Sequence, residues 1–462
     1  MLAWLSTKLG SAPELLRLPS MIAGTLSIPL VYLLGARAVS RSAGLIAAAV
    51  MALSPFMIFY SGDGRTYAVA IALLLGTTLA MLAAARAGRA RWWVLYGVLT
   101  ALAMYTHYTS AFILGAQLLW LLWAHPEARR PALVANLGAV VLFAPWIPSM
   151  LADFDSPTIE ILSALQGDGF AIKRLAVESW AYGYPYVLPQ EVPGRFASFL
   201  IVIALAAAAV VGLLRWRAAE LDRKRRFPPP SKGIVLVLAL ALATPVAELL
   251  ILGLTGNDLF GARNLNTSSA GLSLAIGAVL ASAGPIAGTA CVVAVLTGFS
   301  IGAARTLRAE SEAIRFDQAA ELIEEQAGPG DVVLDALSAA ITPVPLTPLE
   351  IYLDQPPSKP LFFPTGEPPY LPFVSDPPPA NPIFRQAFRE AGEHRVFLVA
   401  SDVEVSEAPP GEPASITDLG VTEIRIELPP GARIVEQERY PGVRAINVFV
   451  IQPDPVVDGR SG

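Results

Sequence analysis

Cysteine and charged residues are scarce in this sequence. The single cysteine, Cys291, lies in an apolar run, which excludes an intrachain disulfide and a cysteine metal site. Only 15% of the 462 residues are charged and 54% are hydrophobic, with a mean hydropathy of +0.53. Soluble domains carry about 25% charged residues. The composition therefore excludes an ordinary soluble protein and indicates a polytopic membrane protein.

Motifs of other protein classes are also missing. The N-terminus lacks the basic start, long apolar centre and small-residue cleavage site of a signal peptide. We find no internal repeat, P-loop or zinc motif, and the Gly-x-Gly pieces lack a strand, turn and helix around them. We expect the lipid bilayer as a partner and no nucleic acid.

Apolar runs predict about ten transmembrane helices, since about 20 residues cross a bilayer as a helix. Residues 1–19 are mildly amphipathic and are predicted to lie at the membrane interface. The predicted spans are 20–36, 43–59, 67–85, 92–107, 109–124, 132–151, 196–214, 233–254, 266–283 and 286–303.

Basic residues are concentrated in alternate loops. Four loops hold 14 of the 21 basic residues of the predicted membrane domain, 1–303, and the positive-inside rule makes these loops cytoplasmic. They are 37–42, 86–91, 125–131 and 215–232, and the last is the most basic. Asp63, the outer loop 152–195 and the C-terminal domain then face outward, so we predict a multi-pass protein of the cell membrane whose C-terminal domain is extracytoplasmic.

The composition changes after residue 303. Residues 304–462 carry 12 basic and 25 acidic residues, against 21 and 13 in residues 1–303. Residues 305–327 have the apolar stripe of an amphipathic helix, and DVVLD, RVFLVAS, EIRIEL and INVFVIQ are typical of strands. With a second helix at IFRQAFREAG and an irregular proline-rich segment at 340–382, the sequence predicts a small soluble α/β domain.

The stretch YSGDGRTY, residues 60–67, places an acid and a base between two long apolar runs. At a membrane edge, Asp63 can help to deprotonate a hydroxyl and Arg65 can hold a phosphate leaving group, because little water screens them there. The structural alternative is that Asp63 caps the helix that begins near Thr66 and pairs with Arg65.

Two further outward residues suit a phosphate. His107, between Tyr105 and Tyr108 in AMYTHYTS, can donate to a phosphate or bind a metal, or can be an ordinary interfacial histidine. Arg263, in NDLFGARNLN, suits bidentate phosphate contact, or a snorkelling contact with lipid.

Three acids remain as candidates. Glu248 lies inside a predicted span, where a carboxyl group is costly and marks a functional site by default, although it can also bridge helices. Asp153 and Asp155 form an acid-x-acid pair in the outer loop that can bind a divalent cation, although solvated acids are common in loops. The sequence establishes no cofactor, and a divalent cation is the one candidate.

Several motifs together resemble a known family. The pieces RLPS, SP-x5-YS-x-acid-x-R-x-Y and YTHY, and the long run from residue 15 to APWIPSML, are similar to bacterial membrane glycosyltransferases of the dolichyl-phosphate-mannose mannosyltransferase type. These are PMT-like enzymes of glycosyltransferase family 39 with the GT-C fold. The similarity covers most of residues 15–335 and is weaker after residue 260.

The resemblance implies a polyprenyl-phosphate sugar donor, transfer on the outer face of the membrane and inversion at the anomeric carbon. Asp63 falls at the family's second outer acidic motif, as a supporting acid that orients the donor phosphate, a metal or the acceptor. The matching donor-phosphate residues are Arg65, Tyr67, His107 and Arg263. Apart from these matches, Tyr60, Tyr108 and Glu248 are possible site residues. The acceptor can be a glycan, a lipid or a protein.

The sequence departs from the family at its start. The family takes its catalytic base from an acidic pair in a first outer loop, and here no residue before Glu14 is acidic and Glu14 does not match the motif. A late start, a fragment or an inactive relative would each explain this. The alternative function is a non-catalytic membrane protein, either a carrier or an envelope scaffold.

Overall fold

The computed structural model of the chain describes most of its residues. These are 6, 8, 13–154, 169–185, 187–223, 231–308, 314–336, 348–353, 361–362, 380–401, 403–406, 415–418, 424–429, 431–442 and 444–453. The chain divides into two compact units, of which the first ends at Thr306 and the second begins at Leu307.

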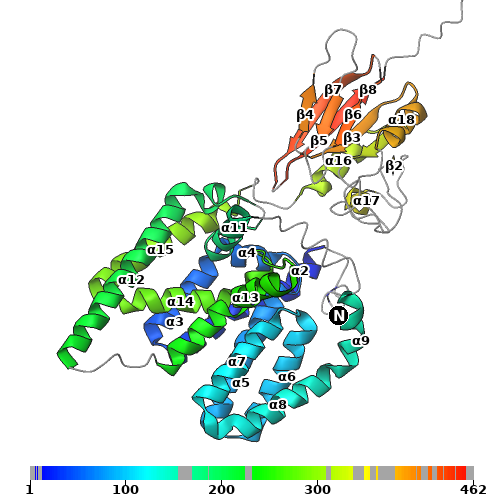
Figure 1. Cartoon of the computed structure of the whole chain (residues 1–462). Coiled ribbons are helices and arrows are strands. Elements are labelled where there is room, and N and C mark those ends of the chain that lie inside the picture. The colour runs from blue at the N-terminus through cyan, green and yellow to red at the C-terminus, as the bar shows by residue number, and fades with distance from the viewer. Residues whose placement is uncertain are drawn as a thin grey trace, which may run out of the picture. The chain divides into compact units, whose positions relative to one another are not determined.

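The first unit is helical (Figure 1). Its α-helices are α2 (Pro13–Ala38), α3 (Arg41–Leu53), α4 (Pro55–Gly62), α5 (Tyr67–Ala87), α6 (Ala90–Thr106), α7 (Ser110–Ala124), α8 (Arg129–Phe143), α9 (Ile147–Phe154), α11 (Phe170–Ala181), α12 (Arg195–Arg223), α13 (Lys232–Thr255), α14 (Ser269–Ser282) and α15 (Pro285–Arg305). Short helical turns are η1 (Pro126–Ala128), η2 (Ala144–Trp146), η3 (Gln190–Gly194) and η4 (Asn264–Ser268).

This unit is a polytopic membrane domain, but the predicted number of about ten spans is wrong. Among the described residues, seven helices are long and apolar enough to cross a membrane, or eight if α3 and α4, bent by 60°, count as one. The predicted spans 92–107 and 109–124 correspond to α6 and α7, which have only 17 and 15 residues. Helix α6 ends at Thr106 because the backbone of His107 is extended.

Three predicted boundaries also differ. Helix α2 begins at Pro13, so residues 13–19 continue the helix and are not a separate interfacial segment. Helix α12 continues to Arg223, so part of the predicted loop 215–232 is helical. The predicted helix 305–327 is two elements, since α15 ends at Arg305 and α16 begins at Phe316.

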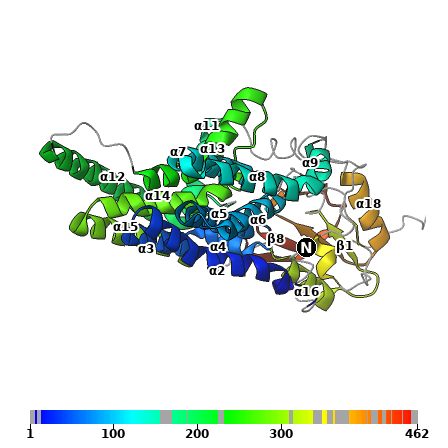
Figure 2. The ribbon, with the colours of Figure 1, turned by 90° about the horizontal axis from the view of Figure 1, so that it is seen from below.

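Two hydrophobic clusters hold the helices together. The larger joins α2, α3, α4, α5, α6, α7, α13 and α14, and the smaller joins α3, α12, α14 and α15. Figures 1 and 2 both show α12, α14 and α15 side by side. Glycines allow close approach, because a Cβ atom on Gly44 of α3 would lie 2.6 Å from the carbonyl oxygen of Tyr32 in α2.

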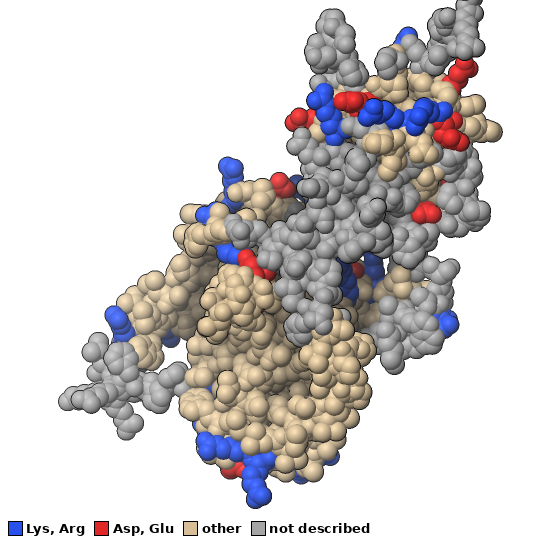
Figure 3. Space-filling model, turned by 45° about the vertical axis from the view of Figure 1, so that its right-hand side comes forward, with Lys and Arg blue, Asp and Glu red and all other residues tan. Residues whose placement is uncertain are grey.

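The two ends of α5, α6, α7 and α8 differ in their residues. Five exposed arginines lie in or next to the turns that join α5 to α6 and α7 to α8, at positions 86, 89, 91, 129 and 130. The turns before α5 and after α6, with Asp63 and His107, lie at the other ends of the same helices. Figure 3 shows a broad uncharged surface on this unit with charged side chains at its margins. This pattern is typical of a membrane protein.

The second unit is a small α/β sheet region. A five-stranded sheet has the order β2-β1-β3-β8-β7, in which β1 (Val332–Asp335) is parallel to β2 (Leu361–Phe362) and β3 (Val396–Ala400), whereas β8 (Ile446–Gln452) is antiparallel to β3 and to β7 (Arg433–Tyr440). A second, antiparallel sheet contains β4 (Val403–Ser406), β5 (Ser415–Asp418) and β6 (Ile424–Glu427).

Side chains alternate between the two faces of the larger sheet, and on both faces those of β1, β3 and β8 are buried by packed layers. One face packs against α18 (Ala380–Ala391) and the smaller sheet, and the other packs against α16 (Phe316–Gln326) and α17 (Pro348–Tyr352). The four predicted strands correspond to β1, β3, β6 and β8, whereas β2, β4, β5 and β7 were missed. Most of the predicted segment 340–382 lies outside the described residues.

Candidate functional site

The turn between α4 and α5 is fixed by its own sequence. Ser54 caps α4 by accepting from the amide of Met57, and Pro55 follows at the first helical position, where its missing N–H costs nothing. Helix α4 ends at Asp63, and Gly64 then takes a φ of 71°, which a residue with a Cβ atom rarely adopts. The hypothesis that Asp63 caps the next helix is wrong, because Thr66 is the N-cap residue of α5.

Asp63 is held by cations. The Nε atom of Arg65 lies 3.6 Å from its Oδ2 atom. Burial raises the pKa of Asp63, while the charges of Arg65 and Arg17 oppose that rise. The hydroxyl of Ser20 donates to the carbonyl oxygen of Arg65 at 2.6 Å and ties α2 to the turn. The turn thus presents one partly buried acid and two arginines.

An aromatic chain connects this turn to the next one at the same end of the helices. We use that name for Tyr184, Phe59, Tyr60, Tyr67 and His107, whose successive ring centroids lie 5.2, 5.0, 4.7 and 5.1 Å apart. Burial, and to a lesser extent the charge of Asp63, raises the pKa of Tyr184 to about 12. Its phenol therefore keeps its proton at neutral pH and can donate it in a hydrogen bond.

His107 is a neutral hydrogen-bond donor. Its Nδ1 atom lies 3.4 Å from the backbone amide nitrogen of Thr109 and 2.7 Å from the hydroxyl of the same residue. Because the amide can only donate, Nδ1 accepts and the proton is on Nε2. Burial, and then the charge of Arg263, lowers the pKa of His107 to about 4. The Nε2–H group remains to donate to a ligand.

We expect this histidine to make the folded state sensitive to mild acid. Below pH 6.5 the unfolded chain binds a proton at His107, whereas the folded chain does so only near pH 4. Stability is therefore complete above pH 6.5 and falls by about 2 kcal/mol between pH 7 and pH 5. Thermal unfolding in detergent at both pH values, compared between wild type and His107→Gln, measures this loss. An equal loss in the variant would contradict it.

Arg263 lies just before η4, which packs against α5 and α7. Its Nη2 atom is buried and has no hydrogen-bond partner among the described residues. A buried donor of this kind is costly without a partner. It suits an acceptor such as a phosphate oxygen, and its charge acts on His107.

The other predicted site residues lie elsewhere. Tyr108 accepts from the indole of Trp146 at 3.0 Å and so contacts η2. Glu248 is buried in α13. Asp155 lies outside the described residues, and for Asp153 only its place in α9 is described.

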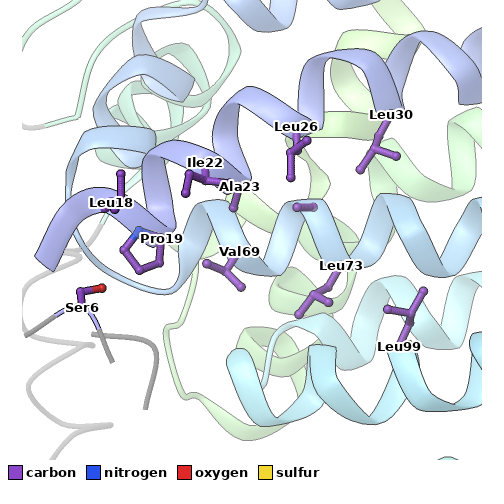
Figure 4. Close-up of a pocket in the computed structure, with 11 residues that line it drawn as sticks. Ser6, Leu18, Pro19, Ile22, Ala23, Leu26, Leu30, Val69, Leu73 and Leu99 are labelled. Atoms are coloured by element: carbon purple, nitrogen blue, oxygen red, sulfur yellow. The ribbon is translucent and has the colours of Figure 1, made fainter. Parts of the chain in front are cut away.

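An apolar groove runs between α2, α5 and α6 (Figure 4). Its volume is about 680 Å³, and its lining includes Leu18, Leu26, Val69, Leu73 and Leu99. In α2 the lining residues Leu18 and Pro19 lie between the two residues that approach the α4–α5 turn, positions 17 and 20. The groove therefore begins beside the acid and its arginines.

The turn does not suit a metal. Its single carboxylate is flanked by two arginines, whereas a divalent cation needs several oxygen ligands. Within the part of the chain that the structure describes, no three His, Cys, Asp or Glu side chains are close enough to share an ion. We derive no step through a metal.

Several contributing residues were not predicted as site residues. Arg17 was assigned to an interfacial segment, and Tyr184 was only one of several aromatics in the outer loop. The ion pair between Lys173 and Asp258 joins α11 to the loop after α13. In the sequence, the one signal for Asp258 as a site residue is the short loop NDLFGAR, where a single acid and a single arginine lie between two apolar runs.

Residues 1–148 match the protein family described as dolichyl-phosphate-mannose-protein mannosyltransferase. The resemblance to this mannosyltransferase family is confirmed over that range. The matched range contains Asp63, Arg65, Tyr67 and His107, and Arg263 lies outside it. No curated protein sequence matches the chain.

The solved structures of ArnT, AglB and AftD show weaker similarity. ArnT from Cupriavidus metallidurans, bound to undecaprenyl phosphate, is 13% identical with a TM-score of 0.48, over 97% of this chain and 86% of ArnT. AglB from Archaeoglobus fulgidus, in complex with an inhibitory peptide and a dolichol-phosphate, is 13% identical with a TM-score of 0.43, over 73% of this chain and 53% of AglB. AftD from Mycobacteria, an arabinofuranosyltransferase, is 16% identical with a TM-score of 0.39, over 96% of this chain and 34% of AftD. The chain thus spans about half the length of the archaeal protein.

Proposed function

We propose that this chain is a membrane glycosyltransferase that moves a sugar from a polyprenyl-phosphate donor to an acceptor hydroxyl at the outer face of the cell membrane. The observation that carries the proposal is the match of residues 1–148 to a mannosyltransferase family, because that range holds the acid, arginine and histidine of the candidate site. The positive-inside rule favours an outward position for this end of the helices and for the C-terminal unit.

In this proposal, the donor phosphate lies among Arg65, Arg263 and His107. The two guanidinium groups neutralise the charge that develops on the leaving phosphate, and the Nε2–H group of His107 adds a neutral donor. Tyr67 packs between Tyr60 and His107 and holds the imidazole in place. The apolar groove beside Leu18 takes the first isoprene units of the lipid.

The reaction forms a bond between the acceptor oxygen and the anomeric carbon and breaks the bond from that carbon to the phosphate oxygen. Polyprenyl phosphate leaves, and the configuration of the anomeric carbon is inverted. The acceptor proton passes to a base. Asp63 has a supporting role, because its ion pair with Arg65 orients the arginine toward the phosphate.

Lipid binding tests the proposal without knowledge of the acceptor. The purified chain in nanodiscs is titrated with undecaprenyl phosphate and with a phosphate-free polyprenol, and tryptophan fluorescence follows binding. We expect saturable binding of the phosphate lipid at least 10-fold tighter than that of the polyprenol, since a charge-assisted phosphate contact contributes about that factor. Equal affinity for both lipids would contradict a donor-phosphate site.

Catalysis is measured next. Proteoliposomes with undecaprenyl-phosphate sugars, one radiolabelled sugar at a time, are mixed with an envelope extract as the source of acceptors. The expected result is a labelled acceptor together with free undecaprenyl phosphate. Binding of the lipid without turnover of any sugar would instead favour a carrier or an inactive relative.

A further inference from the structure

Glu248 is a carboxyl group inside the membrane domain that has no hydrogen-bond partner among the described residues. It lies in α13 with 0% of its surface exposed, and neither carboxyl oxygen has a hydrogen-bond partner among the described residues. Burying an unpaired polar group costs free energy, and an acid within a membrane helix is retained for a function by default. The phosphate site described above does not use this group.

Lys173, the cation that acts on Glu248, is already paired with another acid. The ammonium group of Lys173 donates to the carboxylate of Asp258 and to the carbonyl oxygen of Phe260. Asp258 also accepts from the backbone amide of Phe260 at 3.0 Å. Lys173 and Asp258 both act electrostatically on Glu248, and their charges oppose each other. Among the described residues, Glu248 thus has neither a counter-ion of its own nor a hydrogen bond.

Two donors without a hydrogen-bond partner among the described residues lie in or next to η4, which packs against the helix of Glu248. Within the described part of the chain, the Nδ2 atom of Asn266 and the Nη2 atom of Arg263 are buried without partners. Helix α13 packs on η4, where the hydroxyls of Thr244 and Thr267 lie 2.8 Å apart. Glu248 comes one helical turn after Thr244 and faces the same side. The carboxyl group of Glu248 and these two donors therefore belong to the surfaces along which α13 and η4 pack.

Helix α11 covers this region. Its Lys173 reaches Asp258, and the indole of Trp180 donates to the hydroxyl of Ser269 at 3.1 Å. These two side chains are seven residues apart and so share one face of the helix. The face of α11 that carries them is fixed to both ends of the segment that holds Arg263 and Asn266.

We infer that Glu248 and Asn266, together with Arg263 of the phosphate site, form a sugar-binding subsite that takes hydroxyl groups of the transferred ring. The inference rests on the proposed function. A hydroxyl group both donates and accepts, so a sugar ring satisfies the carboxyl oxygens of Glu248 and the amide and guanidinium donors together. A lipid tail satisfies none of them, and an ammonium group leaves both donors unused. A second phosphate would meet the negative charge of Asp258.

The test separates the sugar from the lipid phosphate. Wild type and Glu248→Leu in nanodiscs are titrated with undecaprenyl phosphate and with undecaprenyl-phosphate mannose, glucose and galactose. We expect wild type to bind one sugar lipid about 10-fold or more tighter than undecaprenyl phosphate, because hydrogen bonds to a charged group contribute that much. Glu248→Leu should lose this preference and keep its affinity for undecaprenyl phosphate within about 2-fold. Glu248→Gln, which can still hydrogen-bond, should restore part of it.

Thermal unfolding supplies the structural control. Glu248→Leu should unfold at a higher temperature than wild type, because it removes a buried unpaired carboxyl group. If that variant does not fold, Asn266→Leu replaces it with the same binding expectation.

Three results would overturn the inference. A Leu variant that keeps the preference for the sugar lipid would do so, and so would equal losses for both lipids. If the wild-type protein binds undecaprenyl phosphate and binds none of the sugar lipids more tightly than that lipid, the subsite is overturned and the proposed function is not. Failure of wild type to bind any of these lipids would instead remove the proposed function.

Discussion

Arg65→Ala and Asp63→Asn each lower the rate of sugar transfer by about 100-fold or more, the usual loss when one group that stabilises a developing charge is removed. The two variants differ in binding. Arg65→Ala removes a cation from the phosphate site and weakens the affinity for undecaprenyl phosphate. Asp63→Asn removes a negative charge next to that site, so phosphate-lipid affinity stays the same or rises while transfer is lost.

The reason lies in the geometry of the α4–α5 turn. Asp63 ends α4, where the partial negative charge of a helix C-terminus disfavours another anion. Arg65 and Arg17 offset this, and the 3.6 Å ion pair with Arg65 limits the directions that the guanidinium group can take. An asparagine keeps the size of the side chain and loses the charge that directs the arginine.

The measurement is transfer of labelled sugar in proteoliposomes, with undecaprenyl phosphate binding measured on the same preparations. Arg174→Ala is the matched control, since the Arg174 side chain is 64% exposed and its pair with Glu178 on α11 contributes little. The control should transfer sugar at the wild-type rate. Wild-type rates in both turn variants would remove this turn from the mechanism.

Gly44→Ala should destabilise the membrane domain by about 3 kcal/mol, near the upper end of the usual cost of overpacking. The added Cβ atom would lie 2.6 Å from the carbonyl oxygen of Tyr32 and 2.8 Å from the amide nitrogen of Ala36. Both contacts are backbone atoms of α2, so no side chain can rotate away and the two helices must separate. The separation would also move the turn that α2 holds through Ser20.

Gly138→Ala is the matched control for this stability prediction. Gly138 is exposed in α8, and a Cβ atom there would meet nothing within 4 Å. This variant should gain up to about 1 kcal/mol from the higher helix propensity of alanine. Thermal unfolding of both variants in detergent measures the difference. Equal unfolding temperatures would show that α2 and α3 are not packed as closely as the structure has them.

Membrane class, basic turns and most helices could be predicted from the sequence, because hydropathy and charge are properties of short segments. Each predicted span falls on helical residues, although 43–59 covers both α3 and α4 and 132–151 covers α8, η2 and α9. The strands at DVVLD and INVFVIQ are β1 and β8. The number of spans could not be predicted, since it depends on where a helix breaks. The extended backbone at His107 and the bend between α3 and α4 are such breaks.

The sequence by itself determined which polar residues lie at the site end of the helices, because a polar residue between two apolar runs must lie at a helix end. Only the tertiary structure decided which of them meet. The bond from Ser20 to Arg65 spans 45 positions, and the pair of Lys173 with Asp258 spans 85. The sequence offers Glu248 only as a candidate site residue, and only the fold shows that Lys173, the cation that acts on it, is paired with Asp258. No local pattern encodes such a choice, since it depends on packing between distant segments.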